Sequence, residues 1–261
     1  MSIEWPLAAA ALIPMALLAT AVWILSSIRK NVGIIDSFWS LFFVTALFFW
    51  MGPHPDVTPR LLLVSTLVVT WALRLSIYLT VRNWGKPEDR RYQEIRRRNQ
   101  PFYEIKSLFY VFYLQVILAW LVALPLLPAL KSDAPLGLYD GLGAALFLFG
   151  LLMESIADAQ MARFKALDRP KGSVMNQGLW RYSRHPNYFG EALLWWGFIL
   201  ITLSAGGSPW LILSPLFMTF LLMKVSGIPL LEADLMKRGP AYRRYIETTS
   251  AFWPKPPKEG P

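Results

Sequence analysis

The sequence predicts an all-α integral membrane protein with seven transmembrane helices. Hydrophobic residues make up 55% of the 261 residues and charged residues only 16%. Apolar runs long enough to cross a bilayer follow one another closely, so we expect a single membrane domain over residues 1–261. The predicted spans are 6–28, 34–51, 61–81, 108–130, 136–157, 188–204 and 209–230.

Local features support the individual spans. The first run has only Glu4 before it and no small-residue cleavage site after it, so we expect a span rather than a cleaved signal peptide. The fifth contains GLGAALFLFG (141–150); these glycines lie inside a span with no strand before them, which indicates close helix packing rather than a nucleotide-binding loop. The sixth begins in a polar motif, and the seventh leads into a polar tail.

Basic residues predict the orientation. Four alternate segments, namely the connection at Arg29–Lys30, the loops 82–106 and 163–184 and the C-terminal tail, hold 22 Lys and Arg, whereas the opposite connections hold 2. By the positive-inside rule the C-terminus lies in the cytoplasm and the N-terminus outside, which requires an odd number of spans. We expect a multi-pass protein of a bacterial inner membrane, and attribute the net charge of +9 to topology rather than to nucleic-acid binding.

Several ionisable residues lie within or at the edges of the spans. Each would cost roughly 2.5–3.5 kcal/mol if it faced lipid at a helix centre. One interpretation is pairing between helices, for instance of Arg74 with Asp36 or Glu154. The other is a polar cavity open to the cytoplasm, which the clustering of the set near the cytoplasmic ends favours. The set is Asp36, Arg74, Glu154, Asp158, Glu191 and Lys224.

The polar motif GLWRYSRHPNYFGEALLWW (178–196) opens the sixth span. Together with the basic loops it predicts a site that clamps phosphates and stacks a flat ring, with Tyr182, Tyr242 and Tyr245 as the expected stacking residues. The chain has no cysteine and only two histidines, so we expect no metal centre.

The motif RHPNYFGE, followed by E…G…Y…Y, resembles the steroid 5α-reductase family, here as a bacterial-type member. The wider group includes sterol C14 reductases and isoprenylcysteine carboxyl methyltransferases. The resemblance covers residues 154–254 well, and NVGIIDSFW and RNWGKPEDRRY extend it into the N-terminal half. It implies a seven-helix reductase that binds NADPH in a cytoplasm-facing cavity and passes a hydride to the β-carbon of an α,β-unsaturated ketone in a steroid-like lipid.

The resemblance also implies roles for residues on the two polar helices. Asn187 and Glu191 match cofactor-binding positions, and Tyr188 and Trp195 would border the same site. Asp158 falls on an acidic position of the family.

Other matched positions carry positive charge. Lys165 stands where the family has a phosphate-binding arginine, and Arg163 is expected to assist it. Arg184 and His185 match the motif of the sterol C14 reductases.

Two positions depart from the family. Asp36 stands where the 5α-reductases have a glutamate that helps hold the substrate ketone, and Trp71 where they have a tyrosine that polarises it. An indole donates a hydrogen bond but is no acid at neutral pH. Asp36 is therefore expected to stabilise the enolate oxygen if burial keeps it protonated.

Two further functions stay open. One is an S-adenosylmethionine-dependent membrane methyltransferase of the isoprenylcysteine type, whose cofactor carries no phosphate. The other is a lipid-binding or transport protein, which the absence of a charged path across the bilayer disfavours. We expect the partners to be a steroid or other lipid enone and membrane lipid, with no obligate protein partner.

Overall fold

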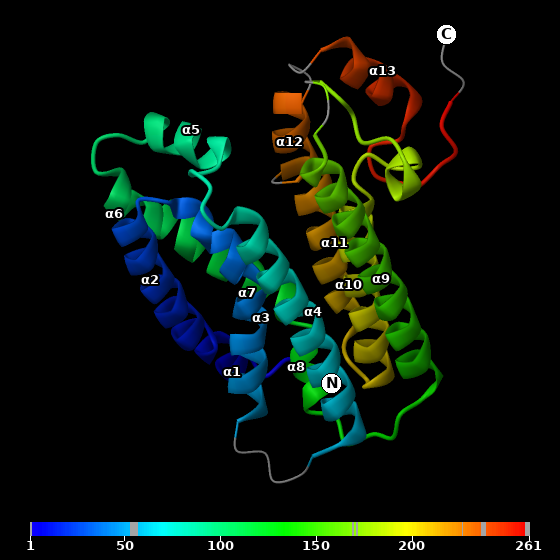
Figure 1. The fold of residues 1–261 in the computed structure, drawn as a ribbon. Coiled ribbons are helices and arrows are strands. Elements are labelled where there is room, and N and C mark those ends of the chain that lie inside the picture. The colour runs from blue at the N-terminus through cyan, green and yellow to red at the C-terminus, as the bar shows by residue number, and fades with distance from the viewer. Residues whose placement is uncertain are drawn as a thin grey trace. The chain divides into compact units, whose positions relative to one another are not determined.

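The computed structural model describes residues 2–52, 57–168, 170, 172–225, 227–235 and 239–258. All regular elements in this part of the chain are helical (Figure 1). Five helical segments within it are long and apolar enough to span a membrane, in agreement with the first five predicted spans. They are Trp5–Arg29, Val32–Met51, Pro59–Asn83, Tyr103–Ala123 and Leu138–Ala166.

The last two predicted spans have weaker support. Helix α10 (Pro186–Ser204) carries Asn187 and Glu191 in its first two turns, which lowers its mean hydropathy. The apolar helix Pro209–Val225 is shorter than the five candidate spans. The chain is thus a multi-pass helical protein by length and composition, while the count of seven spans and the orientation stay predictions.

The chain divides into two compact units, each built from two separate stretches. Unit 1 comprises Met1–Gly141 and Ile201–Ser214, and unit 2 comprises Leu142–Leu200 and Pro215–Pro261.

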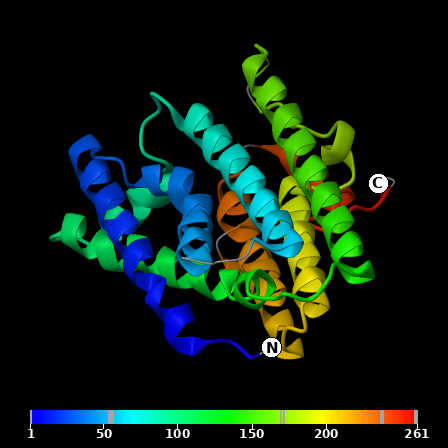
Figure 2. The same ribbon diagram turned by 90° about the horizontal axis from the view of Figure 1, so that it is seen from below.

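Unit 1 is centred on helix α3, which packs between α2 and α4 (Figures 1 and 2). Phe43 of α3 packs edge-to-face on Trp71 of α4, with ring centroids 5.2 Å apart, and both rings are fully buried. The helices are α1 (Trp5–Ala10), α2 (Leu12–Arg29), η1 (Val32–Ile34), α3 (Ile35–Met51), α4 (Pro59–Asn83), α5 (Arg90–Arg98), α6 (Tyr103–Ser107), η2 (Leu108–Tyr113), α7 (Leu114–Ala123), α8 (Leu126–Leu130) and η4 (Pro209–Ile212).

Helix α4 begins where its sequence predicts a start. The Thr58 hydroxyl accepts a hydrogen bond from the Leu61 N–H, and Pro59 occupies the first turn. The next residue, Arg60, is fully buried and donates two hydrogen bonds of 2.9 Å to the Asp140 carboxylate. A buried arginine needs such partners because an unpaired charge is costly there.

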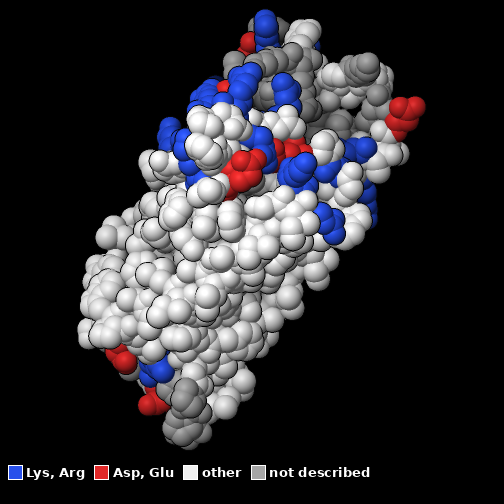
Figure 3. Space-filling view, turned by 90° about the vertical axis from the view of Figure 1, so that its left-hand side faces the viewer, with Lys and Arg blue, Asp and Glu red and all other residues white. Residues whose placement is uncertain are grey.

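On the face of the molecule that Figure 3 shows, many charged side chains lie at the upper end and a few at the lower end, with a broad band without charge between them. Helix α5, with the sequence RRYQEIRRR, belongs to this charged end of unit 1. An uncharged band bordered by basic residues is typical of a surface that faces lipid.

Unit 2 contains the close crossing of α9 and α10. A Cβ atom added at Gly150 would lie 2.6 Å from the Gly190 carbonyl oxygen, and one at Gly197 would lie 2.6 Å from the Gly143 carbonyl oxygen. The prediction of close helix packing is therefore confirmed for Gly143 and Gly150, whereas a Cβ atom at Gly141 would meet nothing within 4 Å. The elements that lie wholly or largely in this unit are α9 (Leu138–Ala166), η3 (Gly178–Arg181), α10, α11 (Leu213–Phe220), η5 (Leu221–Val225), α12 (Ile228–Leu235) and α13 (Pro240–Thr248).

Candidate functional site

The glycine crossing in unit 2 brings four predicted site residues together. The Asn187 amide nitrogen donates a hydrogen bond to the Asp158 carboxylate at 3.2 Å, which joins α10 to α9. One turn further along α10, the Trp195 indole N–H donates to the Glu191 carboxylate at 3.2 Å. Asp158, Glu191 and Trp195 are buried.

The Asn187 side chain keeps one atom unsatisfied. Its amide oxygen is buried and has no hydrogen-bond partner among the described residues. A buried carbonyl oxygen without a partner is uncommon because it loses its bond to water. It is an acceptor available to a ligand with an N–H or O–H group.

Two cations follow at the end of α9. Arg163 and Lys165 are exposed in its last turn, where positive charge suits the helix C-terminus. Lys165 follows Asp158 by seven residues, so it lies on the same helix face about 10 Å along the axis.

The loop before α10 is fastened to α9. The Trp180 indole N–H donates to the Ala157 carbonyl at 3.0 Å, and the Leu179 N–H donates to the Gln160 side chain at 3.0 Å. Gly178 permits this approach with φ of 57°, a conformation that other residues rarely adopt.

Arg184 and His185 of this loop both contact Glu232 of α12. The Arg184 guanidinium makes a two-pronged ion pair with the Glu232 carboxylate, at 2.7 and 3.0 Å, and His185 Nε2 lies 3.1 Å from the same carboxylate. Although burial raises the pKa of Glu232, the bonds from His185 and Arg184 outweigh it and lower that pKa to about 2. The His185 ring also stacks on Tyr188, with centroids 5.5 Å apart.

The three predicted stacking tyrosines differ in exposure. Tyr182 is 43% exposed, whereas Tyr242 and Tyr245 are buried in unit 2. The Tyr245 hydroxyl donates to the Trp180 carbonyl, and burial raises the pKa of Tyr245. Of these three tyrosines, Tyr182 alone presents an accessible ring.

In unit 1, Asp36 has two partners that the sequence did not single out. The Tyr92 hydroxyl donates to Asp36 Oδ1 at 2.5 Å, and the Arg91 guanidinium lies 3.2 Å from Oδ2. Burial and the nearby Asp36 carboxylate raise the pKa of Tyr92 well above 10. The alternative that Asp36 pairs with Arg74 is wrong, because Arg91 of α5 takes that place.

A second ion pair holds α5 in place. The Glu88 carboxylate binds the Arg96 guanidinium, with contacts of 3.0 Å, and accepts a hydrogen bond from the Val32 N–H at 2.8 Å. Because Val32 stands four residues before Asp36, the same end of α3 holds both attachments of α5. The sequence signal for Tyr92 was its position as the lone aromatic residue in an arginine-rich helix.

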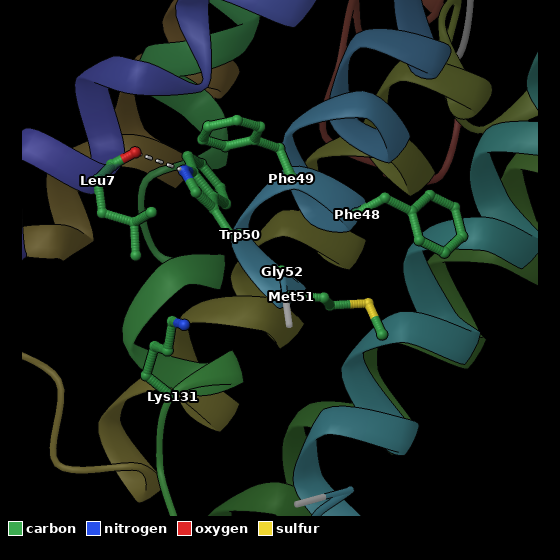
Figure 4. Close-up of a pocket in the computed structure, with 7 residues that line it drawn as sticks. All are labelled: Leu7, Phe48, Phe49, Trp50, Met51, Gly52 and Lys131. Atoms are coloured by element: carbon green, nitrogen blue, oxygen red, sulfur yellow. Dashed lines mark hydrogen bonds between the residues drawn. The ribbon is translucent and has the colours of Figure 1, made fainter. Parts of the chain in front are cut away.

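Trp71, the other predicted catalytic residue, is fully buried against Phe43. The hollow drawn in Figure 4, of about 580 Å³, lies in unit 1 at the end of α3. There the Trp50 indole N–H donates to the Leu7 carbonyl at 3.3 Å. No predicted site residue lines this hollow, whose walls are Leu7, Phe48, Phe49, Trp50, Met51, Gly52 and Lys131.

Comparisons with known proteins found one curated relative and one family. An uncharacterized protein of Schizosaccharomyces pombe is 27% identical over 269 residues, which covers 92% of this chain and 77% of that protein. No solved structure matches. The family described as "Protein of unknown function (DUF1295)" matches residues 22–249. The chain therefore belongs to the DUF1295 family, which is part of the steroid 5-alpha-reductase-like superfamily.

Proposed function

We propose that this protein is a membrane-embedded, NADPH-dependent reductase that acts on the C=C bond of an α,β-unsaturated ketone in a steroid-like lipid. The observation that carries the proposal is the Asn187 amide, which is held by Asp158 and keeps a buried oxygen without a partner. Membership of a superfamily that includes steroid reductases supports the same reading.

The residues around Asn187 fit the nicotinamide end of such a cofactor. The nicotinamide carboxamide offers N–H donors, which match the Asn187 oxygen and the buried carboxylates of Asp158 and Glu191. The exposed side chains of Arg163 and Lys165 would bind phosphate through charge-assisted hydrogen bonds. NADPH, when bound, would supply the hydride that reduces the double bond.

We propose that the Asp36–Tyr92 pair contains the group that stabilises the ketone oxygen. Both Asp36 oxygens already accept hydrogen bonds, so we assign the donor role to the Tyr92 hydroxyl and the orienting role to Asp36. The hydroxyl carries one proton, which would turn from Asp36 to the ketone oxygen when the substrate binds, while Arg91 stays paired with the Asp36 carboxylate. A hydroxyl placed beforehand at the developing enolate oxygen stabilises the transition state more than the ground state. Trp71 stays a predicted neighbour of the substrate.

We further propose seven spans in a bacterial inner membrane, with the cofactor site open to the cytoplasm. The distribution of basic residues supports this orientation, because 22 Lys and Arg fall in alternate segments and 2 in the opposite ones. Arg163 and Lys165 belong to the segments assigned to the cytoplasm, where NADPH is available.

Thermal unfolding of the detergent-purified protein tests the proposal. A ligand at 100 times its Kd stabilises the folded state by about 2.7 kcal/mol. We expect NADPH to raise the Tm of the wild type and S-adenosylmethionine to leave it unchanged. The Asn187→Ala variant serves as the control for specific binding. A rise with S-adenosylmethionine alone would assign the protein to the methyltransferase class instead.

A further inference from the structure

The loop before α10 contains two arginines, Arg181 and Arg184, whose surroundings differ sharply. Arg184 is 8% exposed and fully engaged by other groups, whereas Arg181 is exposed and has no side-chain partner among the described residues. We propose that Arg181 binds a phosphate of the nucleotide and that Arg184 is a positioning residue that fixes the loop through Glu232. This inference rests on the proposed function.

The Arg184 guanidinium has little capacity left for a ligand. Its Nε and Nη2 groups donate to the Glu232 carboxylate, and Nη1 donates to the carbonyls of Ile246 and Thr249. Four hydrogen bonds occupy four of the five N–H groups that an arginine offers. A phosphate that bound Arg184 would have to displace a carboxylate that already neutralises it.

The Arg184 contacts also join three separate parts of unit 2. Glu232 lies on α12, Ile246 on α13 and Thr249 at the start of the C-terminal segment. Removing either partner of a buried ion pair is costly because the remaining charge is left without compensation. A substitution of Arg184 and a substitution of Glu232 should therefore have the same effect, because each releases the same contacts.

Backbone contacts show which segments lie next to the Arg184–Glu232 ion pair. The Arg184 N–H donates to the Ser250 carbonyl at 2.8 Å, and the Lys255 N–H donates to the Tyr182 carbonyl at 2.9 Å. The Ser183 hydroxyl donates to the Phe252 carbonyl at 2.9 Å. The C-terminal segment thus braces the loop that leads directly into α10 and Asn187.

Arg181 stands on the same loop without such commitments. It is the last residue of the turn η3, and the residue before it, Trp180, is buried and anchored on α9. Its backbone position is therefore fixed while its guanidinium stays accessible, which suits a charge-assisted, two-pronged contact with phosphate. An exposed arginine on a fixed loop discriminates NADPH from NADH if it reaches the 2′-phosphate.

Nucleotide binding to matched variants tests the proposal. Dissociation constants for NADPH and NADH are measured for the wild type, Arg181→Ala, Arg184→Lys and Glu232→Gln. We expect Arg181→Ala to weaken the binding of NADPH by about 10-fold or more and the binding of NADH by much less. Arg184→Lys keeps the positive charge but loses the two-pronged contact with Glu232. It should therefore weaken the binding of NADPH and NADH by the same factor, and Glu232→Gln should do the same.

A second measurement separates this inference from the proposed function. Tryptic cleavage after Arg243 and Arg244 of α13 should accelerate in Arg184→Lys and Glu232→Gln and stay at the wild-type rate in Arg181→Ala. A fall in the NADPH to NADH preference in Arg184→Lys, with unchanged cleavage, would overturn the positioning role. Wild-type protein that binds neither nucleotide would reject the proposed function and the phosphate role of Arg181, and the cleavage rates alone would then decide the role of Arg184.

Discussion

The Tyr92 hydroxyl lies 2.5 Å from the Asp36 carboxylate, although the two residues are 56 positions apart. Asp36 lies in the first turn of helix α3, and Tyr92 comes from α5. The Arg91–Asp36 ion pair and the hydrogen bond from the Val32 N–H to Glu88 attach this basic segment to the start of α3. A tyrosine hydroxyl that a carboxylate holds in position can turn its single proton to a ketone oxygen when a substrate binds.

Removal of the Tyr92 hydroxyl should slow the reaction. We predict that Tyr92→Phe lowers the turnover of an enone such as progesterone by about 10²-fold or more, as expected for the loss of an oxyanion donor. Asp36→Ala should have a comparable effect and Asp36→Asn a milder one. Steady-state kinetics should show an unchanged affinity for NADPH in all three variants.

The control for this prediction is Tyr110→Phe, because Tyr110 is 63% exposed and belongs to the surface of unit 1. Its kinetic constants should equal those of the wild type. Normal turnover in Tyr92→Phe would remove the tyrosine from the mechanism.

Substitutions of Asn187 and Glu191 should weaken the binding of the cofactor. Asn187→Ala removes the acceptor oxygen that lacks a partner, and Glu191→Ala removes a buried carboxylate one turn away. The loss of one hydrogen bond to a ligand corresponds to about 0.5–1.5 kcal/mol, or a few-fold to about 10-fold in Kd. Fluorescence titration with NADPH measures this effect, with Asn99→Ala in unit 1 as a control. If both variants titrate as the wild type does, the site is assigned to the wrong residues.

The glycine crossing can be tested by stability alone. Gly150→Ala and Gly190→Ala each place a methyl group 2.6 Å from a backbone carbonyl oxygen. Overpacking of this kind costs about 1–3 kcal/mol, so Tm should fall. Gly141→Ala is the matched control, because a Cβ atom there meets nothing within 4 Å. Alanine favours the helix by about 1 kcal/mol over glycine, and Tm should therefore rise or stay unchanged in that variant.

We predict that the stability of the folded protein depends on pH through Glu232. Its ordinary pKa of 4.5 falls to about 2 in the folded protein, because the bonds from His185 and Arg184 outweigh the opposing effect of burial. A carboxylate with a lowered pKa stabilises the fold fully above its unfolded pKa and loses this contribution as the pH falls through the folded value. The difference in Tm between wild type and Glu232→Gln should therefore be constant above about pH 5 and shrink towards pH 2. A difference that does not change over this window would contradict the assigned ion pair.

The helical membrane fold followed from the sequence because apolar length alone sets the span of a helix. The first five spans agree with the structure, and Gly143 and Gly150 pack closely, as their position inside a span indicated. The sequence also predicted that Asn187 and Glu191 share one face of a helix, because helical spacing brings residues four apart onto the same face.

Partners from distant parts of the chain could not be predicted in this way. Tyr92 and Arg91 reach Asp36 through the docking of α5, and Glu232 reaches Arg184 from α12. Such contacts depend on tertiary packing, and a single sequence carries no periodicity that reports them. Arg74 was the expected partner as another ionisable residue of the spans, whereas the observed partner, Arg91, lies on a helix outside the spans.

The transfer of deuterium from cofactor to product tests the central claim most directly. The purified protein is incubated with progesterone and NADPH that carries deuterium on C4 of the nicotinamide, and the product is analysed by mass spectrometry and NMR. We predict a saturated ketone with one deuterium at the former β-carbon of the enone, formed by the wild type and strongly reduced in Asn187→Ala. A substrate recovered without deuterium, together with methyl transfer from S-adenosylmethionine to a lipid thiol or carboxylate, would contradict the account.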